Sequence, residues 1–312
     1  MSQELAGVKI GHATNHEAHT GCTVFLCPEG SVGGVDIRGP APGSRETDLL
    51  SPYKSVTTIN AIFFTGGSAF GLTIADGVMR YLAEKNIGHP TPVRPIPIVA
   101  GSVVFDLFMN EGKALPDAEM GYQACLDAEK DQLVQGNIGA GAGATVGKWG
   151  GFTGIMKGGF GWASVSIDEL VVGAAAVVNS VGDVVDTGGA VLAGARDPNG
   201  GWQVENDPYR RFPELPPAQL GTNTTLVLIA TNAKLDKVDA NKVAQRAHDG
   251  IAISIRPAHT SHDGDSAYAL STGDVEASFD LVANAAVEVV SEAIRNGVRN
   301  AESAGPFLGL AG

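Results

Sequence analysis

The chain has few cysteines and no long apolar run. Its 312 residues include three cysteines, Cys22, Cys27 and Cys125. Their spacing matches no metal-binding pair, and an odd number cannot all be bridged, so we expect a reducing, cytoplasmic environment. No apolar run near the first residues resembles a signal peptide, and none is long enough to span a membrane. These absences predict a cytoplasmic protein with no membrane partner.

Positive charge is also scarce. The chain has 21 Lys and Arg residues against 34 Asp and Glu residues, a formal net charge of −13. This balance argues against nucleic acid as a partner and mildly favours a cationic substrate, although plain solubility explains it as well and is the interpretation we prefer. With 44% apolar and 18% charged residues, the composition is typical of a compact globular protein with a sizeable core.

Hydrophobic periodicity predicts a mixture of helices and strands. Because the helices cluster in two places and the strands form antiparallel-like groups, the pattern favours a layered α+β protein over an alternating α/β one. Ser68, after Gly66-Gly67, is expected to cap the first helix. The expected strands are 55–65, an extended 93–105, and a meander of 163–167, 170–179 and 183–186; the expected helices are 72–86, 238–248 and 278–294.

The segment Gly221-Thr222-Asn223-Thr224-Thr225 joins a proline-rich stretch to the apolar run 226–230, which suits a strand buried on both faces. A threonine at such a junction is compatible with self-cleavage, in which the Thr224 hydroxyl attacks the Asn223 carbonyl. The freed α-amino group, with a reference pKa of about 7.7–8.0, would then serve as base for the same hydroxyl. An ordinary threonine-rich strand start explains these residues equally simply.

Several glycine-rich motifs lack the context that their usual functions require. Residues 139–144 fit a dinucleotide-binding fingerprint, but the preceding residues 127–135 are charged and poor in strand formers. The phosphate-loop pattern ending at Lys148 has Trp149 where a magnesium-binding hydroxyl belongs. Ser68 nearly forms a nucleophile elbow, but Phe70 replaces its second glycine. A substrate-pocket role for Gly67, Ser68 and Phe70 stays open, because helix ends present N–H groups to ligand oxygens.

Two histidine clusters are candidate metal sites. His12, His16 and His19 would share a face of a helix, although a solvated loop is the simpler interpretation. The second cluster contains Asp263 and Asp265, whose spacing would place both carboxylates on one face of a strand, where they could hold an amine or orient a base. An Asp-Gly turn explains the same residues. The second cluster comprises His259, His262, Asp263 and Asp265.

These motifs occur together and in a recognisable order. The order of 66–72, 223–225 before an apolar strand, and 259–265 resembles the DmpA-type aminopeptidases, which include β-peptidyl aminopeptidases and nylon-oligomer hydrolases. The resemblance runs from about Val8 to the last helix. It implies a self-cleaving amide hydrolase with an N-terminal nucleophile, acting through an acyl-enzyme on short peptides, amino-acid amides or ω-amino-acid oligomers, and needing neither metal nor organic cofactor.

The resemblance also implies roles for individual residues. Thr224 matches the nucleophile, Asn179 the amide that stabilises the oxyanion, and Lys148 a lysine near the nucleophile. Asp263 and Asp265 match two aspartates of the nylon-oligomer branch, where they would orient the nucleophile or hold a substrate's ammonium group. Phe70 stands where relatives often have Tyr, which removes a possible hydroxyl donor.

The fold implied by the resemblance is a single four-layer αββα sandwich. Cleavage between Asn223 and Thr224 would divide it into an α-chain of residues 1–223 and a β-chain of residues 224–312, and such αβ units would assemble into a homo-oligomer, commonly a tetramer. Three alternatives remain open at this point: an acyltransferase of the ornithine acetyltransferase kind, a metallohydrolase built on the second histidine cluster, and a non-catalytic binding protein of the same fold.

Overall fold

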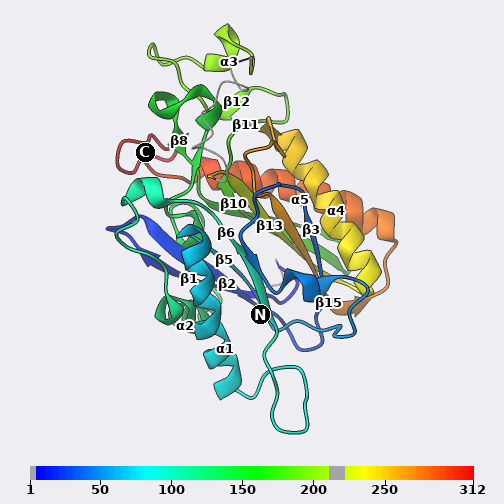
Figure 1. Cartoon of the computed structure of the whole chain (residues 1–312). Helices are drawn as coiled ribbons and strands as arrows, with labels where there is room; N and C mark the ends of the chain where they lie inside the picture. The colour runs from blue at the N-terminus through cyan, green and yellow to red at the C-terminus, as the bar shows by residue number, and fades with distance from the viewer. Residues whose placement is uncertain (1–4, 211–221) are drawn as a thin grey trace.

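The computed structural model describes residues 5–210 and 222–312. In this part of the chain, two five-stranded sheets pack face to face between two pairs of helices (Figure 1). The first sheet has the strand order β1-β2-β5-β6-β4 and the second β3-β15-β13-β10-β9. The helices α1 and α2 pack on the outer face of the first sheet, and α4 and α5 pack on the outer face of the second. This arrangement is the expected αββα sandwich.

The elements have the following bounds. The first sheet contains β1 (Lys9–Asn15), β2 (Thr20–Leu26), β5 (Ala61–Thr65), β6 (Val99–Val103) and β4 (Ser44–Arg45). The second contains β3 (Val32–Ile37), β15 (Ser266–Val275), β13 (Thr224–Ala233), β10 (Leu170–Asn179) and β9 (Phe160–Ile167). The longer helices are α1 (Ile74–Glu84), α2 (Ala118–Ala128), α4 (Lys237–Ser254) and α5 (Phe279–Arg299). Smaller elements are β7 (Thr145–Val146), β8 (Met156–Lys157), β11 (Asp183–Val185), β12 (Val191–Ala193), α3 (Gln203–Asn206) and β14 (Ile255–Arg256).

Strand β13 lies in the middle of the second sheet and is buried on both faces, as its sequence predicts. Val227 and Ile229 contribute to the core beneath α4 and α5. Leu226 and Leu228 contribute to the core between the two sheets. Because side chains alternate between the faces of a strand, a central strand covered by helices on one side and by a sheet on the other must be apolar throughout.

Most of the expected elements are confirmed with shifted bounds, and two expectations are wrong. The third strand of the predicted meander, β11, pairs with β12 and β14 in a separate three-stranded sheet, because β13 already occupies the free edge of β10. Ser68 does not cap the first helix. It begins a short 3₁₀ turn, Ser68–Thr73, that has no side-chain cap, and α1 starts at Ile74.

Two other sequence features are resolved by the fold. His12 lies in β1 and not on a helix, so the three histidines do not share a helical face; burial lowers the pKa of His12 to about 4. The glycine-rich segment Gly139–Gly141 is a 3₁₀ turn, and residues 129–138 before it contain no strand, which removes the context of a dinucleotide site. Among the described helices, none has the length and hydrophobicity needed to cross a membrane.

Candidate active site

Strand directions bring the predicted site residues to one edge of the second sheet. Strand β10 runs antiparallel to β13 and pairs its last residue, Asn179, with Thr224, the first residue of β13. Strand β15 runs parallel to β13, so the segment that precedes it meets the same edge, and Asn223 forms a β-bridge with Asp263. The end of one strand and the beginnings of two others therefore converge on Thr224.

The Asn223–Thr224 peptide bond is buried and held from two sides. Thr224 is 5% exposed, and its Oγ1 lies 2.5 Å from the carbonyl oxygen of Asn223. The same carbonyl oxygen accepts a hydrogen bond of 2.8 Å from the N–H of Gly264. A Cβ atom on residue 264 would lie 2.8 Å from Thr224 Oγ1, so glycine allows this close approach. The arrangement places a hydroxyl beside a carbonyl that an N–H group already polarises.

The two aspartates contact different groups. Asp265 Oδ1 accepts a hydrogen bond of 2.6 Å from the N–H of Thr225, which fixes the residue after the candidate nucleophile. Asp263 Oδ2 accepts hydrogen bonds of 2.7 Å from the N–H and the hydroxyl of Thr260. Asp263 Oδ1 is buried and has no hydrogen-bond partner among the described residues. Asp263 thus keeps one acceptor oxygen available for a proton.

His259 holds Asp265 in position, a contact that the sequence did not predict. The ring Nδ1 of His259 lies 2.8 Å from Asp265 Oδ2, and its backbone N–H donates to the same oxygen at 3.2 Å. Burial lowers the pKa of His259, but the hydrogen bond and the charge of Asp265 outweigh burial and leave this pKa raised. Sequence spacing marked His259 only as a possible metal ligand. Its real partner is visible only once the loop 259–265 is folded.

Lys148 is buried beneath Asn179. Its Nζ donates to the backbone oxygens of Asn179 and Thr145, at 2.9 and 3.0 Å, and to the side-chain oxygen of Asn179 at 2.9 Å. The amide nitrogen Nδ2 of Asn179 points the other way and donates to the carbonyl of Thr222 at 3.3 Å. Lys148 therefore fixes the orientation of the Asn179 amide, whose donor group faces the chain just before the Asn223–Thr224 bond.

Burial and mutual charge tune the site toward proton transfer near neutral pH. Burial lowers the pKa of Lys148 to about 7, although the charges of Asp263 and Asp265 act in the opposite direction. Burial and the neighbouring Asp265 raise the pKa of Asp263 to about 7. Groups with pKa values near the working pH are the most effective general acids and bases. Together with their place beside Thr224, these shifts identify a candidate catalytic centre.

The predicted pocket residues 67–70 lie in the turn after β5. The N–H of Gly67 donates to Asp106 Oδ1 at 2.7 Å, so this donor is already used within the protein. Phe70 is 64% exposed. A substrate-pocket role for Gly67, Ser68 and Phe70 stays a prediction.

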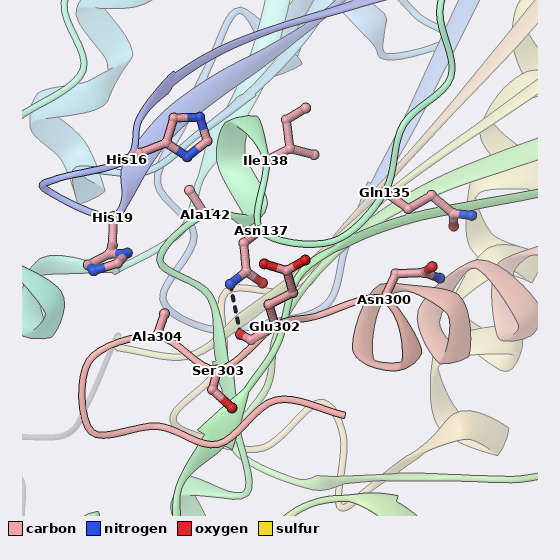
Figure 2. A pocket seen from close by; sticks show the side chains of 10 residues that line it. All are labelled: His16, His19, Gln135, Asn137, Ile138, Ala142, Asn300, Glu302, Ser303 and Ala304. Carbon is pink, nitrogen blue, oxygen red and sulfur yellow. Dashed lines mark hydrogen bonds between the residues drawn. The ribbon is translucent and has the colours of Figure 1, made fainter. Parts of the chain in front are cut away.

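A cavity of about 370 Å³ lies apart from these residues (Figure 2). His16 and His19 of the β1–β2 turn line one side, and Glu302 and Asn137 lie opposite them, with Asn137 Nδ2 donating to the backbone oxygen of Glu302 at 2.8 Å. Neither Thr224 nor the two aspartates line it. Within residues 5–210 and 222–312, no three His, Cys, Asp or Glu side chains are grouped as a metal site would require.

Comparison with known proteins places the chain in a family. Residues 3–309 match the model of peptidase family S58. An uncharacterised aminopeptidase of Mycobacterium leprae is 42% identical over 292 residues, which cover 88% of this chain and 79% of that one. A 6-aminohexanoate-oligomer endohydrolase of Paenarthrobacter ureafaciens is 32% identical over 280 residues, covering 88% and 75% of the two chains.

A solved structure shows the same fold at low sequence identity. The L-aminopeptidase D-Ala-esterase/amidase of Ochrobactrum anthropi, described as a variant of the Ntn (N-terminal nucleophile) hydrolase fold, superposes with a TM-score of 0.72. It is 20% identical, and the match covers 96% of this chain and 86% of that one. From the family match over nearly its whole length, supported by this fold, the chain belongs to peptidase family S58.

Proposed function

We propose that this S58 protein is a self-cleaving amide hydrolase with Thr224 as its N-terminal nucleophile. The observation that carries the proposal is the position of Thr224 Oγ1 beside the Asn223 carbonyl, whose oxygen accepts the N–H of Gly264. The names of the relatives agree with amide hydrolysis, since they include an aminopeptidase and an amide-oligomer endohydrolase. Cleavage would leave chains of residues 1–223 and 224–312 in one folded unit.

Self-cleavage begins with attack of Thr224 Oγ1 on the carbonyl carbon of Asn223. Asp263 takes the hydroxyl proton through its free Oδ1, and the N–H of Gly264 stabilises the negative charge that develops on the carbonyl oxygen. The C–N bond breaks, the nitrogen of Thr224 takes a proton and becomes an α-amino group, and an ester joins Asn223 to Thr224 Oγ1. Water hydrolyses the ester and releases the Asn223 carboxylate and the Thr224 hydroxyl.

Substrate turnover then uses the same hydroxyl with a new base. The α-amino group of Thr224 takes the hydroxyl proton, and the oxygen attacks the amide carbonyl of the substrate. Asn179 Nδ2, which donates to Thr222 in the intact chain, loses this acceptor when the upstream end moves away and can then donate to the substrate's oxyanion. The ammonium protonates the leaving amine, and water hydrolyses the acyl-enzyme to return the free hydroxyl.

Intact mass measured under denaturing conditions tests this proposal. We expect the purified protein to consist of two chains divided between Asn223 and Thr224. A single chain of 32.0 kDa that stays whole after long incubation would contradict self-cleavage, because the nucleophile could then have no free α-amino group.

The rate of self-cleavage should rise with pH until about pH 7 and then level off. The attacking hydroxyl needs an unprotonated base, and Asp263 and Lys148, whose pKa values both lie at about 7, lose their protons across this range. Below the pKa, the unprotonated fraction of such a coupled pair increases about tenfold per pH unit. The rate can be followed by mass spectrometry on newly translated chain held at pH 5.5 and shifted to buffers of higher pH. A rate that falls between pH 6 and pH 7 would contradict the assignment of the base.

A further inference from the structure

A small slot opens beside Lys148 at the candidate active site. Its volume is about 10 Å³, and it is lined by Phe108, Phe152, Ile155, Lys148 and Thr222. Phe108 and Phe152 meet edge to face, with ring centroids 5.2 Å apart and an interplanar angle of 81°. Both rings are partly exposed, Phe108 by 39% and Phe152 by 53%. The structure thus keeps an aromatic pair accessible at the mouth of a slot that leads to a buried lysine.

The intact chain occupies this slot with its own acyl-side residue. In the Asn223–Thr224 bond, Asn223 supplies the acyl carbonyl, and Thr222 is the next residue away from the nucleophile. Thr222 lines the slot, and its carbonyl accepts the Asn179 amide at 3.3 Å. If Thr224 also attacks the substrate, the acyl part of the substrate approaches from this same side. The slot therefore corresponds to the part of the acyl group that lies one residue length beyond the reacting carbonyl.

The charges around the slot select against an ammonium group inside it. Among the described residues that line the slot, Lys148 is the only one with an ionisable side chain, and it is basic. The oxygens of the nearest carboxylates are largely engaged: Asp265 binds Thr225 and His259, and Asp263 Oδ2 binds Thr260. An uncharged apolar segment fits the two rings, whereas a cationic amine would lie next to a second amine without a counterion.

We propose that Phe108 and Phe152 are specificity-determining residues of an acyl-side subsite. The subsite takes an uncharged apolar segment one residue length from the reacting carbonyl, so it favours long aliphatic or aromatic acyl groups over a single α-amino acid with its free ammonium group. This inference rests on the proposed function, and it specifies the substrate class within the amides that the site can hydrolyse.

Matched 4-nitroanilides test the subsite. The substrates are 6-acetamidohexanoyl-4-nitroanilide, which reaches the slot with uncharged methylene groups, and L-alanyl-4-nitroanilide, which is too short to reach it. We expect wild-type protein to prefer the long acyl group. Phe152→Ala should raise the KM for this substrate about tenfold, the effect of leaving roughly two methylene groups unburied. The values for the L-alanyl substrate should change less than twofold. Phe152→Leu should recover most of the loss.

Controls separate failure of the subsite from failure of the proposed function. Tyr53→Ala removes an aromatic side chain that is 95% exposed and should leave both substrates unaffected. Phe152→Ala should still divide at Asn223–Thr224, as seen by intact mass. Equal losses on both substrates, or a wild-type preference for L-alanyl, would overturn the subsite while the hydrolase stands. A chain that stays whole and hydrolyses neither substrate would overturn the proposed function and this inference with it.

Discussion

Replacing Thr224 by Ala is expected to leave a single uncleaved chain with no amide-hydrolysing activity. The variant lacks the oxygen that lies 2.5 Å from the Asn223 carbonyl oxygen in the intact chain. Without it, no ester intermediate forms, and no α-amino group is released to serve as base. Intact mass and hydrolysis of 4-nitroanilides measure the two losses on one preparation. This is the largest effect that the structure predicts, because one substitution removes both reactions.

Thr224→Ser is the matched control. It keeps the hydroxyl and removes only a methyl group from a residue that is 5% exposed. The serine variant should divide and hydrolyse amides, at rates altered by its freer side-chain torsion. A Thr224→Ala protein that still divides between residues 223 and 224, or a serine variant as inactive as the alanine variant, would contradict the assignment of the nucleophile.

Replacing Asp263 by Asn is expected to slow self-cleavage by about 10²–10⁴-fold, the usual contribution of a general acid or base. Asparagine can still accept the hydrogen bonds that Thr260 makes to Asp263 Oδ2. It cannot take a proton from Thr224. The loss should therefore appear in the rate of chain division, measured by mass spectrometry on newly translated chain, while the thermal unfolding midpoint changes little.

Asp183→Asn provides a control for burial. Asp183 is fully buried, burial raises its pKa to about 6, and its Oδ1 accepts hydrogen bonds from Trp149 Nε1 and the N–H of Ala195. It resembles Asp263 in environment but binds a tryptophan and a loop. Its substitution should leave the rate of division within about threefold of wild type, since an interaction away from the reacting atoms contributes little to the transition state. If the two variants divide at the same rate, Asp263 is not the base.

Local patterns predicted much of this structure. The apolar run 226–230 predicts a strand buried on both faces, and β13 is one. The helical periodicity of 278–294 predicts α5, which the structure extends to Arg299. The ordered motifs around 66–72, 223–225 and 259–265 indicated the family that the comparisons confirm. Each of these predictions depends on neighbours in sequence or on an order of motifs along the chain.

Other expectations failed where a partner is distant in sequence. The strand β11 was assigned to a meander with β10, but β13, which starts 45 residues after the end of β10, takes the free edge. Ser68 has the residue type of a helix cap, yet the turn 66–68 is positioned by Asp106 from the end of the neighbouring strand, and no cap forms. Propensity reports local preference, and tertiary contacts override it when they satisfy the same groups better.

The sequence by itself determined the α+β class, the central strand that begins at Thr224, and the residue types of the site. Those features follow from side-chain periodicity and from chemistry carried within short segments. Only the tertiary structure decided that Gly264 donates to the Asn223 carbonyl, that His259 holds Asp265, and that Phe108 and Phe152 face Thr222. Hydrogen bonds and ring contacts depend on distances of a few ångströms between segments far apart in the chain, and such distances are set by how the sheets and loops pack.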